Sequence, residues 1–363
     1  MKKFLIKAVA LIVVVLTVVC GVNYIIDPAN MFHDGVIYDA ADMLANGQAI
    51  ESPGDFDEGK FIEARVAKMT GAPTTLVEGS SHIMFIPYEY DDCFVAGLSS
   101  SYLGDFYAVT GVFEAYDLMP ERVVFGIDPW MFESGYDGGS HGSIKDYAVA
   151  KYEIMNGKRS DYSGVSSLDG ITFDKVKEIT SFSYFQLSID AIKMKGLGYF
   201  TGDGRRKAVP ASDPEAGGFA CILPNGRRTF GSLSAGTPES VKAEAETNIN
   251  SGYIAHLGGS FTGTNEDNFT YFKELCEDLQ SKGIEVVFYL PSFYPDVYDY
   301  FGENPAYAGV SSFEEEIREY AASQNIEVRG SYNPHEAGAE GADFYDWIHL
   351  NSASASENFA YIR

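Results

Sequence analysis

The pattern of apolar and polar positions divides the chain into a long apolar N-terminal segment and two stretches in which strand and helix patterns alternate. Nearly continuous apolar runs between turn residues are typical of strands buried on both faces of a parallel sheet. Such runs stand at 74–77, 93–98, 122–127, 284–290 and 326–328. Helical spacing predicts helices at 39–46, 59–68, 182–195 and 265–282, and a Ser312-x-x-Glu315 capping box predicts the start of another. Strand–helix–strand units of this length predict an α/β fold with a parallel sheet and right-handed crossovers.

The N-terminal apolar segment predicts a transmembrane helix. It extends from Ala8 to Ile26, which corresponds to about 28 Å of helix, close to the thickness of a bilayer core. Lys2, Lys3 and Lys7 precede it, so the positive-inside rule places the N-terminus in the cytoplasm and the rest of the chain outside it. A cleaved signal peptide is the alternative, but no small-x-small cleavage site follows the run. We expect a single-pass anchor in the cell membrane.

The irregular stretches of the sequence suggest how the domain is organised. Residues 1–27 are expected to be the anchor and 28–73 a connector. Residues 74–130 and 256–363 hold the strand and helix patterns of the α/β core. Regularity is lost between them, where Gly, Ser, Asp and Tyr dominate much of 131–255, so this segment is expected to be a large insertion or cap.

Composition and charge exclude some partners. The chain of 363 residues contains 52 acidic and 26 basic side chains, a formal net charge of −26. Such a field repels phosphate backbones, so nucleic acid is not expected as a partner, and attachment to a membrane is expected to depend on the hydrophobic segment. Of the four cysteines, Cys20 lies in the anchor, and the other three allow at most one disulfide and suggest no metal cluster.

Two short stretches contain candidate catalytic residues. Gly79-Ser80-Ser81 follows a predicted strand, so Ser81 is expected on the turn at the strand's carboxyl end, where α/β proteins place their sites. Asp346 and His349 are three residues apart and can face the same way in a turn. A serine hydroxyl needs a base to become a nucleophile, and the base needs an acid to orient it. We predict Ser81 as nucleophile, His349 as base and Asp346 as its partner.

These motifs resemble the first and last blocks of the SGNH/GDSL hydrolase superfamily. The layout is most similar to the anchored cell-surface members that work beside membrane-bound O-acyltransferases in alginate acetylation and teichoic-acid D-alanylation. The similar segments are Asp27-Pro28, Gly79-Ser80-Ser81, Gly126 to Phe132, Val286 to Pro291 and Asp343 to His349. The resemblance implies a three-layer α/β/α fold with a flavodoxin-like parallel sheet. It also implies an extracytoplasmic esterase or O-acyltransferase that acts on a cell-surface polysaccharide, possesses no cofactor and has a membrane-bound O-acyltransferase as its partner.

The sequence departs from this family at the donors of the oxyanion hole. The family has a glycine in its second block, near Ser100, and an asparagine in its third, near Asp128. A carboxylate would repel a developing oxyanion, and the loss of one donor costs about 3 kcal/mol. Either the oxyanion hole uses backbone N–H groups together with Ser100 or Ser101, with Gly126 as a further candidate, or turnover is slow. The residues expected in the pocket wall are His82, Asp128, Trp130 and Trp347.

Other interpretations of the same residues remain. Ser81 could cap a helix, Asp346 and His349 could form a surface pair, and His335 is a rival base. A non-catalytic accessory or glycan-binding subunit of an acyltransferase system is the alternative function, because the oxyanion blocks are altered. A metal-dependent hydrolase is disfavoured because the remaining histidines have no ligand-like spacing, and no metal site is predicted.

Overall fold

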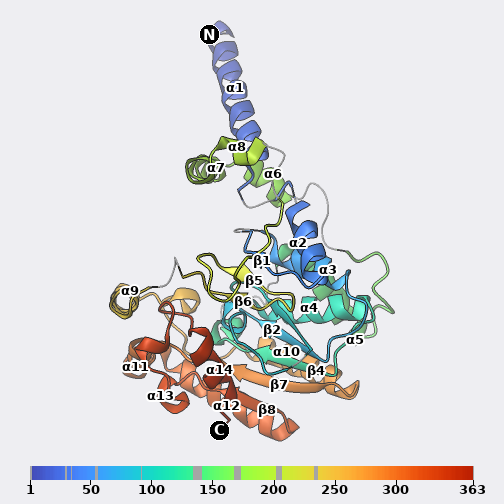
Figure 1. Cartoon of the computed structure of the whole chain (residues 1–363), viewed down its shortest axis with the longest axis vertical. Coiled ribbons are helices and arrows are strands. Elements are labelled where there is room, and N and C mark those ends of the chain that lie inside the picture. The colour runs from blue at the N-terminus through green and yellow to red at the C-terminus, as the bar shows by residue number, and fades with distance from the viewer. Residues whose placement is uncertain are drawn as a thin grey trace.

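The computed structural model describes residues 2–28, 31–33, 35–53, 56–90, 92–133, 141–166, 173–201, 207–232 and 236–362. Five parallel strands form the central sheet in the order β3-β2-β4-β7-β8 (Figure 1). They are β2 (Thr75–Gly79), β3 (Cys93–Gly97), β4 (Arg122–Gly126), β7 (Glu285–Leu290) and β8 (Glu327–Gly330). The predicted α/β class and its parallel sheet are confirmed, with strand limits within three residues of those expected.

Fourteen α-helices lie in the described part of the chain. They are α1 (Lys2–Ile26), α2 (Gly35–Ala45), α3 (Glu58–Val66), α4 (Leu103–Ala115), α5 (Lys145–Met155), α6 (Phe173–Ile179), α7 (Phe182–Lys195), α8 (Leu197–Thr201), α9 (Pro238–Ser251), α10 (Glu266–Ser281), α11 (Pro295–Glu303), α12 (Gly309–Gln324), α13 (Pro334–Ala337) and α14 (Ser352–Ala360). The capping-box prediction is wrong in its position, because α12 already begins at Gly309. The Ser312 hydroxyl instead donates to the Gly309 carbonyl from within the first turn.

Helices cover both faces of the sheet, which explains why its inner strands are largely apolar. Successive side chains of a strand point to opposite faces. On β7, Phe288 packs against Phe272 of α10, whereas its neighbour Tyr289 packs against Phe359 of α14. Phe106 of α4 contacts the same Phe272, so α4 and α10 share one face. Both faces of the strands are therefore removed from water.

The strand order creates a switch point between β2 and β4. From β2 the chain first moves to β3 on one side and then returns to β4 on the other. Numbered along the chain, the order is 2-1-3-4-5, as in flavodoxin-like sheets. Chains that leave adjacent strands in opposite directions open a crevice at the carboxyl ends of those strands, and ligands bind there. This crevice lies where β2 ends, just before Ser81.

The segments expected to be a connector and an insertion contact several parts of the molecule. The strand β1 (Ile50–Glu51) pairs with β5 (Cys221–Ile222), which pairs with β6 (Arg228–Thr229), in a separate small antiparallel sheet. The loop between β5 and β6 covers the edge of β3, since the Val95 N–H donates to the Asn225 carbonyl. Helix α5 packs against α4, while α6, α7 and α8 pack against α1. All four cysteines are free thiols.

Helix α1 matches the predicted anchor in length and hydropathy. It has 25 residues with a mean hydropathy of 2.8 in its most apolar window, which makes it long and apolar enough to span a membrane. Most of its side chains are exposed, and Figure 1 shows it extending away from the domain. An apolar helix that is not covered by protein requires another apolar environment.

Glu78 on β2 is an acidic side chain buried in the core. Its side chain is 1% exposed; Oε1 accepts a hydrogen bond from Thr110 on α4, and Oε2 has no partner in the described structure. Burial raises the pKa of Glu78 well above its usual value, although Thr110 acts in the opposite direction. The folded state therefore holds a proton that the unfolded state releases above about pH 4.3.

We expect Glu78→Gln to stabilise the protein at pH 8 and to have little effect at pH 4. A carboxyl whose pKa is raised on folding makes stability fall with pH, by at most about 1.4 kcal/mol per pH unit, between its unfolded and folded pKa values. Glutamine keeps the shape and removes that slope. Urea unfolding in detergent at both pH values measures the difference. An equal effect of the substitution at pH 4 and pH 8 would show that folding does not raise the pKa of Glu78.

Candidate active site

Ser81 lies on a tight turn directly after β2. It is the first residue of a 3-10 turn (Ser81–Ile83), and the Ser80 hydroxyl caps this turn by accepting the His82 N–H at 3.2 Å. Gly79 is needed for close approach, because a Cβ there would lie 3.0 Å from both the Gly126 carbonyl and the Ile83 side chain. The turn thus packs against the end of β4 and leaves Ser81 partly exposed at the switch point.

Asp346 and His349 lie on a second tight turn near the C-terminus. The Asp346 Oδ1 atom accepts the backbone N–H groups of Ile348 at 2.8 Å and His349 at 2.7 Å. The His349 carbonyl accepts the Tyr345 N–H, which closes the turn. Within it, His349 Nδ1 lies 2.9 Å from Asp346 Oδ2. The short spacing of the motif therefore fixes the imidazole through the backbone as well as through the carboxylate.

The two turns meet at the carboxyl edge of the sheet. His349 Nε2 lies 2.8 Å from Ser81 Oγ, so all three predicted residues form one hydrogen-bonded chain. Burial alone would raise the pKa of Asp346, but the hydrogen bonds from His349 and the backbone lower it below its usual value. An ionised Asp346 can only accept, so it favours the tautomer with a proton on Nδ1. This tautomer leaves Nε2 free to accept the Ser81 proton.

His82 and Asp128 form a second, buried pair beside this chain. His82 Nδ1 lies 2.7 Å from Asp128 Oδ1, and its Nε2 lies 3.2 Å from the carbonyl oxygen of Ile348. Burial lowers the pKa of His82, but the Asp128 carboxylate outweighs it, and the net shift is upward. An acceptor lies within reach of each ring nitrogen, an arrangement that favours the protonated ring. His82 therefore fixes the backbone directly before His349, and Asp128 carries the counter-charge.

The side chains of Ser100 and Ser101, both predicted at the oxyanion hole, bond to other residues. The Ser100 hydroxyl lies 3.1 Å from His256 Nε2, and Ser101 is buried with its hydroxyl 3.5 Å from Asp105. Gly126 gives space to Ile83, since a Cβ there would lie 2.2 Å from it. The side-chain donors predicted at Ser100 and Ser101 are thus engaged elsewhere.

Backbone donors remain at two positions. Ser100 has a φ of 57°, the left-handed conformation that favours glycine. In the described part of the chain, neither the Ser81 N–H nor the Ser100 N–H donates to a protein acceptor. Backbone N–H groups of this kind can stabilise an oxyanion without a side-chain amide.

A small hollow borders the site. Trp130 and Trp347, both predicted as wall residues, line it together with His82, Ile254, His256, Leu257, Phe293, Val297 and Ile348. The Trp130 indole donates to the Ser101 carbonyl, which fixes the ring next to His82 and His256. The hollow has a volume of about 20 Å³, which is room for about one water molecule. Asp128 lies behind His82 rather than in this wall.

The sequence did not indicate the aromatic stack on the other side of His349. Phe230 lies between Phe85 and Tyr345, with ring centroids 3.7 Å apart on each side. Phe85 also meets the His349 ring edge-on at 5.6 Å. Phe230 directly follows β6, so a segment expected to be an insertion contributes to the site. Because aromatic residues make up 14% of the chain, no single one of them stands out in the sequence as part of such a stack.

His335 lies apart from the Ser81 chain, whereas His256 contacts Ser100 and Trp130 at its border. His335 pairs with Asp299 at 2.8 Å on the surface, which supplies the acidic partner that the sequence did not reveal, but no serine contacts it among the described residues. No group of three or more His, Cys, Asp or Glu side chains suited to a metal ion occurs in the described part of the chain.

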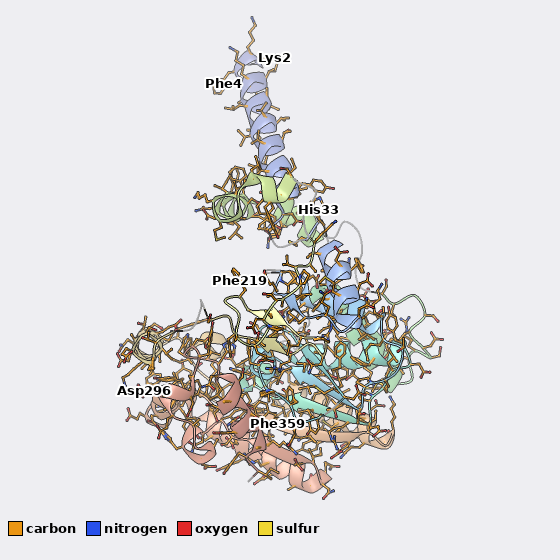
Figure 2. All side chains as sticks on the ribbon, in the orientation of Figure 1. Lys2, Phe4, His33, Phe219, Asp296 and Phe359 are labelled. Atoms are coloured by element: carbon orange, nitrogen blue, oxygen red, sulfur yellow. The ribbon has the colours of Figure 1, made fainter. Side chains whose placement is uncertain are left out.

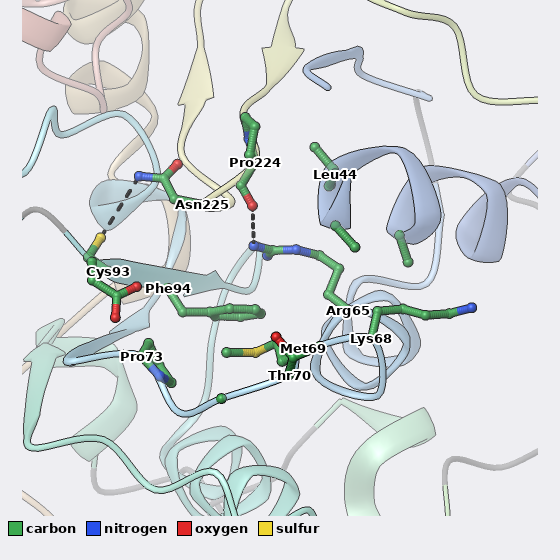
Figure 3. A pocket seen from close by; sticks show the side chains of 14 residues that line it. Leu44, Arg65, Lys68, Met69, Thr70, Pro73, Cys93, Phe94, Pro224 and Asn225 are labelled. Carbon is green, nitrogen blue, oxygen red and sulfur yellow. Dashed lines mark hydrogen bonds between the residues drawn. The ribbon is translucent and has the colours of Figure 1, made fainter. Parts of the chain in front are cut away.

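A larger hollow lies at the opposite edge of the sheet, near the amino ends of β2 and β3 (Figure 3). It measures about 400 Å³, and its lining includes Arg65, Cys93 and Phe94. The Arg65 guanidinium stacks on the Phe94 ring and donates to the carbonyls of Val95 and Pro224. Burial lowers the pKa of Arg65 to about 9. This cation is satisfied by backbone groups and faces away from the Ser81 turn.

The buried His82–Asp128 pair generates a stability prediction. We expect His82→Ala to destabilise the fold by about 3 kcal/mol, because it leaves the Asp128 carboxylate buried without a partner. The double variant with Asp128→Ala should regain much of this loss. The pKa of His82 is raised in the folded state, so the pair contributes fully to the free energy of unfolding below about pH 6.5. This contribution is lost as the pH rises through the folded-state pKa. Urea unfolding at pH 6 and pH 9 checks both statements.

The matched control is the exposed pair of His335 and Asp299. His335→Ala should change the free energy of unfolding by less than about 0.5 kcal/mol, since exposed ion pairs contribute little. Equal losses for the two histidine variants would contradict the role assigned to burial.

Comparisons with known proteins do not identify a family for this chain. No model of a known protein family matches the sequence, and no curated protein is similar to it. The interpretation of the site therefore depends on its own geometry. A serine, a histidine and an aspartate are joined by successive hydrogen bonds at the switch point of a parallel sheet.

Proposed function

We propose that this protein is a membrane-anchored serine enzyme of the SGNH type that transfers or hydrolyses a short acyl ester outside the cytoplasm. The observation behind the proposal is the unbroken hydrogen-bonded chain from Ser81 Oγ through His349 to Asp346. A surface Asp–His pair that only fixes the C-terminal segment would not need to direct its free nitrogen at a serine hydroxyl.

The chemistry begins with Ser81. As its Oγ attacks the carbonyl carbon of an acyl ester, His349 Nε2 takes the hydroxyl proton. Asp346 stabilises the resulting imidazolium through Nδ1. When the tetrahedral intermediate collapses, His349 returns the proton to the departing alcohol and the acyl group remains on Ser81. A second alcohol or a water molecule then attacks this acyl-enzyme, with His349 acting again as the base.

The oxyanion would be held by the backbone. The unpaired N–H groups of Ser81 and Ser100 are the donors that we assign to it. Asp128, at the place of the family's asparagine, is paired through Oδ1 with His82 at 2.7 Å, whereas its Oδ2 has no hydrogen-bond partner among the described residues. The pairing reduces the repulsion that this carboxylate would exert on a developing oxyanion.

The substrate we propose is a short acyl group, such as acetyl, on a hydroxyl of a cell-surface polysaccharide. The short acyl group rests on the resemblance in motif order, because the hollow beside His82 has room for only about one water molecule. The glycan and a membrane-bound O-acyltransferase as partner rest on the resemblance in motif order. The lysines before α1 and its apolar length support a single-pass anchor with the α/β domain on the outer side.

A non-catalytic accessory role is the second candidate. It is favoured by one observation: the side-chain hydroxyls of Ser100 and Ser101 are bonded to other residues, so an oxyanion would have backbone donors alone. Loss of a single donor reduces rates by about a hundredfold or more. Such a protein would keep the fold and bind glycan or the acyltransferase.

Labelling with a fluorophosphonate probe separates the two functions. We expect the full-length wild type to be labelled and Ser81→Ala to be unlabelled, with p-nitrophenyl acetate hydrolysis lost in parallel, because only an activated serine reacts with the probe. Ser99→Ala is the matched control, since Ser99 is exposed and bonded to Glu58. It should be labelled like the wild type. An unlabelled wild type with an unchanged fold would favour the accessory role.

Asp346→Asn tests the orienting carboxylate. The amide can donate to Nδ1 and so favours the wrong tautomer, with the proton on Nε2. We expect kcat to fall by up to about 10⁴-fold while the protein stays folded. The rate of ester hydrolysis and the thermal unfolding temperature are measured on the same preparation. A decrease of less than about threefold would argue that Asp346 has no part in the chemistry.

A further inference from the structure

Three helices pack around the end of α1 and lie apart from the five-stranded sheet (Figure 1). We call residues 173–201, which form α6, α7 and α8, the collar. Asn23 of α1 is buried, and its side-chain amide donates to the carbonyls of Glu178, Ile179 and Ser181. The anchor therefore binds the collar through a specific polar contact inside an otherwise apolar helix.

A second polar contact and an apolar cluster complete this packing. The Tyr184 hydroxyl of α7 donates to Asp27 Oδ1 at 2.7 Å, and Asp27 also accepts the N–H groups of Met31 and Phe32. Ile26 packs with Ala191 and Phe200 in a small core of its own. The collar is thus built onto the anchor and is not a loose loop beside it.

The collar shortens the free part of the anchor. Val19, Asn23 and Ile26 are the buried residues of α1, whereas the large apolar side chains from Phe4 to Val18 are exposed. Figure 2 shows Lys2 and Phe4 at the far end of this free segment. Fifteen residues of helix span about 22 Å, less than the roughly 30 Å of a bilayer core. A bilayer that covers the whole apolar length of α1 must therefore reach the level of the collar.

The outer surface of the collar is apolar where such a bilayer would meet it. Large apolar side chains are exposed on α7 and α8, and they are Phe182, Leu187, Met194, Leu197 and Tyr199. Met194, at 78%, is the most exposed of them. On α7 the side toward α1 holds Tyr184, Ser188 and Ala191, and the polar residues Gln186, Asp190 and Lys193 form a separate stripe. Exposed large apolar side chains grouped beside an apolar anchor mark a surface that lipid can cover.

We propose that the collar lies in the outer interface of the bilayer, with the ends of α7 and α8 inserted among the lipids. This inference rests on the proposed passage of α1 through the membrane. It makes the anchor and the collar a single membrane-bound unit that fixes how deeply the chain sits, instead of a flexible tether. Since the chain carries a net charge of −26, apolar insertion and not attraction to anionic lipid supplies the binding.

Spin labels on the full-length protein in phosphatidylcholine vesicles test the collar. The background carries Cys20→Ser, because the other three cysteines are buried. Labels at Met194→Cys and Leu197→Cys are compared with one at Lys242→Cys, an exposed position on α9. We expect the ratio of collisions with oxygen to collisions with a water-soluble nickel chelate to be several-fold higher at either collar site than at Lys242, because oxygen concentrates in lipid.

Two further labels complete the test. A label at Lys193→Cys, on the polar stripe next to Met194, should give a collision ratio closer to that at Lys242 than the label at Met194 gives. A label at Val14→Cys reports on the anchor, and its ratio should be as high as expected in lipid. Water-like ratios at both Met194 and Leu197 with a lipid-like Val14 would overturn the proposal and leave the anchor intact. Poor access of both reagents to both collar sites would also overturn it, by showing that protein covers them. Fluorophosphonate labelling of Ser81 on the same vesicles reports the active site separately.

Discussion

The arrangement of the site depends on one hydrogen bond of 2.8 Å, between His349 Nε2 and Ser81 Oγ. It joins a turn after the first strand of the central sheet to a turn close to the C-terminus, 268 residues away. The bond can form only because the parallel sheet brings the carboxyl ends of its strands to one edge and opens a crevice at the switch point. Gly79 and Gly126 make room for the Ser81 turn, so the packing of two strand ends determines where the Ser81 hydroxyl lies.

The buried pair of His82 and Asp128 is the second feature of the site. Asp128 Oδ1 lies 2.7 Å from His82 Nδ1. The Nε2 atom of the same ring lies 3.2 Å from the carbonyl oxygen of Ile348, one residue before His349. The pair therefore helps to fix the backbone that carries the His349 imidazole.

The segments outside the core have separate tasks. The loop between β5 and β6 covers an open sheet edge, and Phe230 after β6 completes the aromatic stack beside His349. The collar packs on α1, far from that site in the chain's fold. One long irregular stretch of sequence therefore supplies both a wall of the proposed active site and the proposed contact with the membrane surface.

The sequence by itself determined the features that depend on neighbouring residues: the apolar helix α1, the five strands of the parallel sheet, and the Asp-x-x-His turn that orients His349. Only the tertiary structure decided the start of α12, the burial of Ser101, the pairing of His82 with Asp128 and the arrival of Phe230 at the site. The physical reason is the range of the interactions. Hydrophobic periodicity and turn chemistry act over a few residues, whereas the direction of a side chain at a strand end depends on which distant segment packs against it.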